Sequence, residues 1–112
     1  MKLSKNFSLK EMLVTSTGVA NVPTDKDIDN MKLLTEKILQ PLREYMNRPI
    51  IVTSGYRSYD VNKRVGGSKT SQHCKGEAAD LTAGTRTLNK IMYEFIRDNL
   101  VYDQLINEYN YQ

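Results

Sequence analysis

The feature of this sequence that most constrains the fold is a long helical pattern in its first half. Apolar side chains recur there at spacings of three and four residues, at Ile28, Met31, Leu34, Ile38, Leu42 and Tyr45. Such a spacing puts them on one face of a helix, and that face has to be buried. Thr24 is a suitable N-cap for this helix. Pro41 predicts a kink or a split within it, because proline has no backbone N–H to donate.

Shorter elements are predicted on either side of the long helix. Ser8 and Glu11 have the spacing of a capping box, which predicts a short helix in front of a loop at 15–23. After the long helix, the β-branched run at 50–54 predicts a buried strand. A further short helix is expected at 59–65.

The second half of the chain predicts the remaining strands. Strands are expected at 77–82 and 103–107, with a helix from about residue 86 between them. The buried face of that helix is predicted to consist of Leu88, Ile91, Met92, Phe95 and Leu100. This order predicts an α+β fold, with a small, mostly antiparallel sheet and helices packed on one side of it. Residues 1–112 are expected to form a single domain.

Composition narrows the possible functions. The chain has 16 Lys and Arg against 13 Asp and Glu, and this small, scattered excess argues against a nucleic-acid partner. No apolar run approaches the roughly 18–20 residues of a membrane helix, so no membrane insertion is expected. The lone cysteine, Cys74, permits no intrachain disulfide. The first residues lack the apolar stretch of a signal peptide, which predicts synthesis in the cytoplasm.

The stretch that is most informative about chemistry runs from residue 71 to residue 80. His73 and Asp80 lie seven residues apart, with Gly76 between them. On a helix they would be about 10 Å apart along the axis, but a turn at Gly76 would let them converge. An imidazole and a carboxylate are suitable zinc ligands. A surface pair, or a hydrogen-bonded histidine in the core, explains the same spacing, and residue chemistry leaves these alternatives open.

Two motifs carry a resemblance to a known family. Ser71, His73, Gly76, Ala78 and Asp80 fit the pattern S-x-H-x-x-G-x-A-x-D, and the run Val-Thr-Ser-Gly-Tyr-Arg-Ser at 52–58 fits an S-G-[YF]-R-[ST] element. Together they resemble the bacterial and phage zinc D-Ala-D-Ala carboxypeptidases and L-alanyl-D-glutamate endopeptidases, which share a fold with the hedgehog signalling domain. The resemblance covers nearly the whole chain and is greatest to the short phage and prophage members.

This resemblance implies a zinc peptidase that hydrolyses the peptide stems of bacterial peptidoglycan, such as a phage lytic enzyme that reaches the cell wall after release. His73 and Asp80 would be metal ligands. Arg57 would stabilise negative charge on the reaction intermediate, and Ser71 would support the loop or the substrate. The alternatives are that Arg57 is a surface side chain bonded to backbone carbonyls and that Ser71 makes only local hydrogen bonds.

The sequence departs from the family at the third metal ligand, a histidine near the C-terminus, because this chain has one histidine. We therefore expect either a truncated enzyme or a degenerate, non-catalytic module that binds cell wall or protein. With two ligands, zinc binding should be weak and hydrolysis poor. Glu108 is the candidate general base, with an exposed strand-end residue as the alternative. Cys74 is not expected to replace the missing ligand, since adjacent side chains of an extended chain point in opposite directions.

Overall fold

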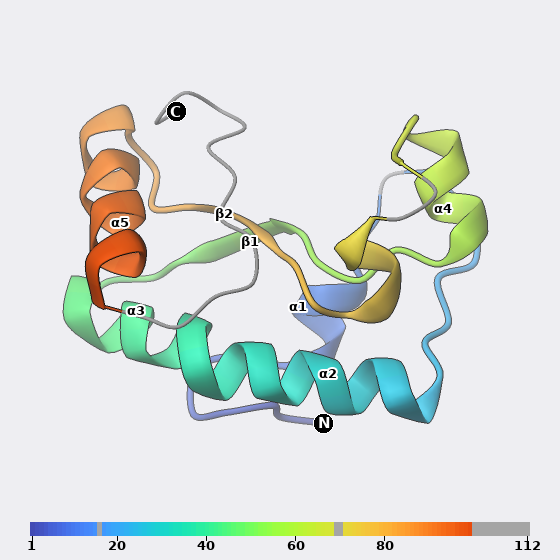
Figure 1. Cartoon of the computed structure of the whole chain (residues 1–112), viewed down its shortest axis with the longest axis horizontal. Helices are drawn as coiled ribbons and strands as arrows, with labels where there is room; N and C mark the ends of the chain where they lie inside the picture. Colours follow the sequence, from blue (N-terminus) through green and yellow to red (C-terminus); the bar gives the residue numbers. More distant parts are fainter. Residues whose placement is uncertain (16, 69–70, 100–112) are drawn as a thin grey trace.

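The computed structural model describes residues 1–15, 17–68 and 71–99. Its elements in chain order are α1 (Leu9–Leu13), α2 (Asp25–Leu34), η1 (Thr35–Leu39), α3 (Gln40–Met46), β1 (Ile51–Ser54), α4 (Tyr59–Arg64), η2 (Gln72–Lys75), β2 (Asp80–Thr82) and α5 (Arg86–Asn99). Figure 1 shows α2 and α3 as one continuous rod beneath the two strands, with α5 at one end of the molecule and α4 at the other. The predicted α+β fold is confirmed.

The long helix begins and continues as its sequence predicts, with one difference at the proline. The Thr24 hydroxyl accepts a hydrogen bond from the Asp27 N–H, so the predicted cap is present. Ahead of Pro41 the chain widens into the π-helical turn η1, in which the Gln40 N–H bonds to the Thr35 carbonyl, five residues back. The prolyl nitrogen then falls in the first turn of α3. The predicted interruption is therefore a local change of helix type rather than a break.

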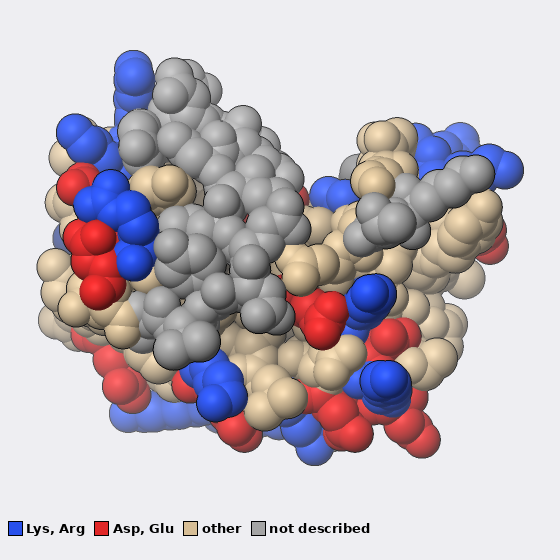
Figure 2. All heavy atoms as spheres, in the orientation of Figure 1, with Lys and Arg blue, Asp and Glu red and all other residues tan. Residues whose placement is uncertain are grey.

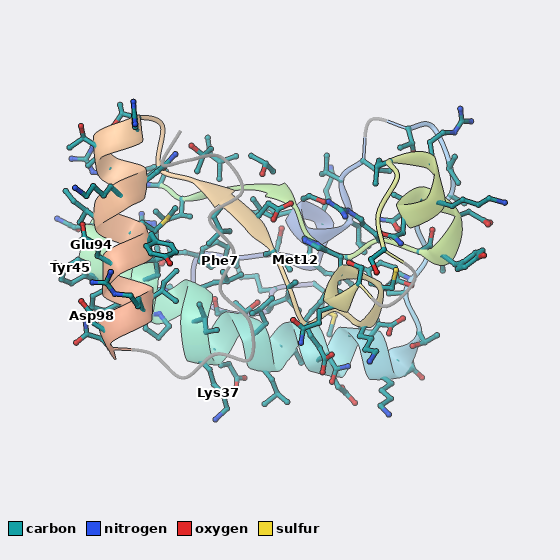
Figure 3. All side chains as sticks on the ribbon, turned by 45° about the horizontal axis from the view of Figure 1, so that its top comes forward. Phe7, Met12, Lys37, Tyr45, Glu94 and Asp98 are labelled. Atoms are coloured by element: carbon teal, nitrogen blue, oxygen red, sulfur yellow. The ribbon has the colours of Figure 1, made fainter. Side chains whose placement is uncertain are left out.

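The core is formed mainly by the N-terminal half of the chain. Its fully buried apolar side chains include Phe7, Met12, Met31, Leu39 and Leu42. Figure 3 shows Phe7 and Met12 inside the molecule, whereas Lys37 points outward from the long helix. The predicted capping box of α1, between Ser8 and Glu11, is also present. The buried side chains of the long helix, of α1 and of the segment before α1 belong to one core cluster.

Two predictions of buried aromatic and aliphatic side chains are wrong. Tyr45 is 57% exposed and stacks on Phe95 of α5, with ring centroids 3.9 Å apart. Ile91 is 41% exposed, because the buried face of α5 runs through Asn89, Met92 and Ile96 instead. The Asn89 side-chain oxygen accepts the Ala83 N–H at 2.6 Å and so joins α5 to the turn before it. Because of this bond, the side of α5 that carries Asn89 faces the interior. Leu100 lies outside the described residues.

The two described strands are antiparallel, and their register places the candidate site. Ile51 pairs with Thr82, and after an irregularity at Thr53 Ser54 pairs with Asp80. Such bulges redirect side chains at the end of a strand. The predicted burial of the first strand is wrong for Ile51, which is 57% exposed, because the strand has only one covered face.

The second strand is shorter than predicted, since it begins at Asp80 rather than at residue 77. Gly76 adopts a left-handed conformation (φ +74°), and the Glu77 N–H closes the turn onto the Gln72 carbonyl. Residues 77–79 therefore still lead out of that turn. The predicted strand at 103–107 lies outside the described residues. None of the helices within the described ranges is long and apolar enough to cross a bilayer.

Candidate functional site

The structure brings His73 and Asp80 together, as the motif predicts. His73 lies on η2 and Asp80 is the first residue of β2, and the left-handed turn at Gly76 reverses the chain between them. The His73 Nε2 atom is 3.5 Å from the Asp80 Oδ1 atom, and both side chains are buried. Two groups that are seven residues apart are thus within reach of a single ligand.

The hydrogen bond on the other side of the imidazole determines the tautomer of His73. His73 Nδ1 lies 2.7 Å from the carbonyl oxygen of Gly55. A carbonyl only accepts, so Nδ1 carries the proton, and in the neutral ring Nε2 presents a lone pair. That lone pair faces a carboxylate oxygen. Two acceptors at this distance repel each other unless the ring is protonated or a cation lies between them, and the pair therefore fits a metal ion.

The described residues bring two candidate metal ligands together, without a third. Within residues 1–15, 17–68 and 71–99, no three His, Cys, Asp or Glu side chains form a group able to hold a metal. Catalytic zinc usually takes three protein ligands and keeps one open position. His73 and Asp80 fit two of those positions. Glu108, the predicted general base, lies outside the described residues.

Arg57 joins the other side of Asp80. Its Nη2 atom is 3.4 Å from Asp80 Oδ2, and its Nε donates to the Ser54 hydroxyl at 3.0 Å. Its own backbone N–H donates to the His73 carbonyl at 3.0 Å. Among the described residues, the guanidinium therefore contacts a hydroxyl and a carboxylate rather than the backbone carbonyls of the alternative interpretation. One of the two Asp80 oxygens faces a cation and the other faces the imidazole.

Ser71 acts on His73 through the backbone. Its hydroxyl accepts the His73 N–H at 3.2 Å and caps η2, while its carbonyl accepts the Cys74 N–H at 3.1 Å. These local bonds hold the turn that presents the imidazole. They match the alternative of a locally bonded loop serine and also the support of the loop that the resemblance implies.

Cys74 is half-buried, and no described metal-binding group includes it. Burial raises the pKa of its thiol, although the nearby Arg57 guanidinium acts in the opposite direction. The thiolate, which is the form that binds metal, is therefore disfavoured at neutral pH. The geometric reason given from the sequence is wrong, because residues 72–75 form a 3₁₀ helix in which neighbouring side chains are a third of a turn apart.

Two residues of the site were not predicted from the sequence. Ser54 holds the Arg57 side chain, and Gly55 supplies the carbonyl that orients His73. A Cβ atom on Gly55 would lie 2.6 Å from the Met12 carbonyl oxygen, so only glycine fits against α1. Both residues belong to the run at 52–58 that carries the second motif, which was the available signal.

Tyr56 is buried between the site and α2. Burial, together with the Asp27 carboxylate to which its hydroxyl is hydrogen-bonded, raises the pKa of Tyr56 to about 12. The phenol is therefore protonated at neutral pH and donates to Asp27. Through this bond the segment that carries Arg57 is joined to the first turn of the long helix.

The surroundings of the site are visible in the ribbon and space-filling views. The η2 turn lies between α4 and the sheet (Figure 1). Figure 2 shows one face of the molecule in the same orientation. Acidic and basic side chains are interspersed on the face shown there.

Comparisons with known proteins agree with the motifs. The family model described as Peptidase M15 matches residues 5–111. The zinc D-Ala-D-Ala carboxypeptidase of Streptomyces albus G is 46% identical over 55 residues, which are 48% of this chain and 22% of that protein. The match therefore spans less than a quarter of the relative's length. Because the family model covers nearly the whole chain, the chain belongs to the peptidase M15 family, as its two motifs predict.

Proposed function

We propose that this chain is a zinc-dependent peptidase of the D-Ala-D-Ala carboxypeptidase type that hydrolyses the peptide stems of peptidoglycan. The observation that carries the proposal is the pair formed by His73 Nε2 and Asp80 Oδ1, 3.5 Å apart. The peptidase M15 family model and the name of the Streptomyces relative support the same reaction class. The cell wall as the place of action, expected from the sequence, is part of this proposal.

His73 and Asp80 would hold the metal through Nε2 and Oδ1. Zinc, when bound, supplies Lewis-acid polarisation of a carbonyl and lowers the pKa of water toward about 7. The Gly55 carbonyl keeps the proton of the neutral ring on Nδ1 and fixes the ring plane. Such a bond to the far nitrogen of a ligating histidine orients the ring and raises its basicity.

Arg57 would bind and stabilise negative charge on the substrate. One of its terminal nitrogens is already near Asp80 Oδ2, and its Nε is bonded to Ser54. A guanidinium offers five N–H donors in a planar fork, so further donors remain for a substrate oxygen. Stem peptides end in carboxylates, and peptide hydrolysis develops negative charge on the scissile carbonyl oxygen. A fixed cation would stabilise either of these negative charges. Glu108 remains the candidate to accept the proton of the attacking water.

A second candidate function is a non-catalytic module that binds stem peptides without cleaving them. The observation that favours it is that the described residues contain no group of three side chains able to hold a metal ion. In that case Arg57 and the metal-binding pair would still recognise an anionic peptide. Zinc would then be held weakly, because a missing imidazole reduces both affinity and geometric definition.

The test is D-alanine release from a synthetic pentapeptide stem ending in D-Ala-D-Ala. The chain is assayed after chelation and again with zinc restored, and mass spectrometry of the products separates terminal from internal cleavage. We expect slow, zinc-dependent release that is lost in Asp80→Asn. Asp98→Asn is the matched control, since Asp98 is an exposed carboxylate paired with Arg97 on α5. Peptide binding without cleavage in every variant would establish the non-catalytic function instead.

A further inference from the structure

The segment that carries Arg57 has no secondary structure of its own. Residues 55–58 lie between β1 and α4 and belong to neither. Backbone N–H and carbonyl groups in such a buried segment need partners from elsewhere. Tyr56 N–H donates to the Met12 carbonyl at 2.7 Å, and Arg57 N–H donates to the His73 carbonyl. The remaining groups beside Arg57 are held by a side chain that is distant in sequence.

That side chain is Asn21, in the loop between α1 and α2. Its Nδ2 donates to the Tyr56 carbonyl at 2.9 Å and to the Leu13 carbonyl at 3.0 Å. Its Oδ1 accepts the Ser58 N–H at 2.6 Å. Tyr56 and Ser58 are the two neighbours of Arg57. A single amide therefore bonds the backbone on both sides of Arg57 and joins it to the last residue of α1.

We propose that Asn21 is a positioning residue that fixes Arg57 for its action on the substrate. This inference rests on the proposed function, in which Arg57 stabilises substrate charge. With the backbone held at both neighbours, the guanidinium is confined to the position from which it reaches Ser54 and Asp80. Ser58 adds a parallel tie, since its hydroxyl donates to the Ala20 carbonyl at 3.0 Å.

The chemistry of the three bonds requires an amide. Asn offers two donors and one acceptor at one branch point, which is the number used here. Aspartate would keep the acceptor for Ser58 but lose both donors and place negative charge against two carbonyls. Serine has one donor and a shorter reach. Asn21 was not singled out in the sequence, because its partners lie 35 and 37 residues away.

The first experiment tests whether Asn21 holds the Arg57 side chain in place, and it does not depend on enzymatic activity. Hydrogen exchange of the Arg57 Nε–H with water is followed by NMR in the wild type, Asn21→Ala and the control Asn99→Ala. Asn99 also donates its amide to a backbone carbonyl, that of Phe95, at the far end of α5. Because Nε–H is bonded to Ser54, we expect slow exchange in the wild type and in Asn99→Ala, and at least fivefold faster exchange in Asn21→Ala. Unchanged exchange in Asn21→Ala would overturn the proposal. Asn21→Ser serves the same purpose if Asn21→Ala does not fold.

The second experiment is a double-mutant cycle on D-alanine release with Asn21→Ala and Arg57→Ala. Misplacement of a group that acts on the substrate costs on the order of 10–100-fold in rate. If Asn21 acts through Arg57, Asn21→Ala reduces kcat by that factor in the wild type and has no further effect in Arg57→Ala. Additive losses would mean a general structural role and would overturn the proposal. If the wild type releases no D-alanine, the proposed function fails, while the exchange measurement still decides the role of Asn21.

Discussion

The helical scaffold at 1–47 and the site segment at 51–83 are built by different interactions. In the scaffold the buried side chains are almost all apolar, including Phe7, Met12, Met31 and Leu42. In the site segment most of them are polar, namely Asn62, His73 and Asp80, beside the apolar Tyr56 and Val61. The scaffold consists mainly of helices, whereas much of the site segment consists of turns and short elements.

This difference suggests that the stability of the fold and the geometry of the site depend on different interactions. Burying a large apolar side chain contributes about 1.5–3 kcal/mol, while a typical hydrogen bond contributes a net 0.5–1.5 kcal/mol. Hydrogen bonds, however, are directional. We infer that the scaffold supplies most of the free energy of folding and that the bonds of the site segment determine where His73, Asp80 and Arg57 lie. Four predictions test this division.

The largest effect on stability is expected in the scaffold. Leu42 is completely buried, and Leu42→Ala should lower the free energy of unfolding by about 2–5 kcal/mol, since it removes apolar contacts and leaves a cavity. Leu33→Ala is the matched control, because Leu33 is 50% exposed on the same helix. Urea unfolding of the two variants measures the difference. Equal losses would show that burial along the long helix does not govern stability.

Gly55→Ala is expected to reduce stability less than Leu42→Ala does, but to disturb the site more, because the Gly55 carbonyl orients His73. Its added Cβ in Gly55→Ala would press on the Met12 carbonyl, which should destabilise the fold by about 1–3 kcal/mol. The shifted backbone would also move the Gly55 carbonyl away from His73 Nδ1 and so weaken zinc binding. Gly66→Ala is the control, since an added Cβ at Gly66 meets open space, while its positive φ (+76°) makes alanine costly there for a reason unrelated to the site. Zinc titration alongside urea unfolding would contradict the account if both variants bound zinc alike.

The pH dependence of stability tests the contact between Tyr56 of the site segment and Asp27 of the helical scaffold. The pKa of Tyr56 is raised from 10.0 to about 12 in the folded chain. Its contribution is fully present below pH 10 and is lost as the pH rises through 12, because the unfolded chain gives up the proton first. Between pH 9 and pH 11 the free energy of unfolding should fall by roughly 1.4 kcal/mol more in the wild type than in Tyr56→Phe. If the free energy of unfolding changed with pH in the same way in both proteins, the pKa of Tyr56 would not differ between the folded and the unfolded chain.

The smallest effect is expected at the cap of the long helix. Thr24→Ala removes the hydroxyl that accepts the Asp27 N–H and should cost about 1 kcal/mol of stability. Zinc affinity should not change, because no site hydrogen bond involves Thr24 among the described residues. A Thr24→Ala variant with normal stability but reduced zinc affinity would reverse the assignment of the two regions.

The sequence predicted the parts of the molecule that depend on near neighbours. The caps at Ser8 and Thr24 were predictable because their partners lie three residues away. The convergence of His73 and Asp80 was predictable from a motif with a glycine at the turn. The start of β2 was missed, since the turn after Gly76 extends to residue 79 and strand periodicity alone does not mark its end.

Contacts between distant positions could not be predicted from the sequence. The tautomer of His73 depends on the Gly55 carbonyl, 18 residues away. The buried face of α5 is turned by one Asn89 bond to Ala83, which an apolar pattern does not record. Asn21 is a loop residue by composition and acquires its contacts only when the loop meets the segment at 55–58. These are the contacts that shape the site.

The most direct test of the account is zinc affinity in variants of the metal-binding pair. Competition with a chromophoric chelator is measured for the wild type, His73→Ala, Asp80→Asn and the control Asp98→Asn, with urea unfolding of each metal-free chain. We expect one weakly held zinc per chain in the wild type and in Asp98→Asn, at least tenfold weaker binding in the two site variants, and a fold retained in all four. Wild-type affinity in both His73→Ala and Asp80→Asn would contradict it, because zinc would then be held without the pair.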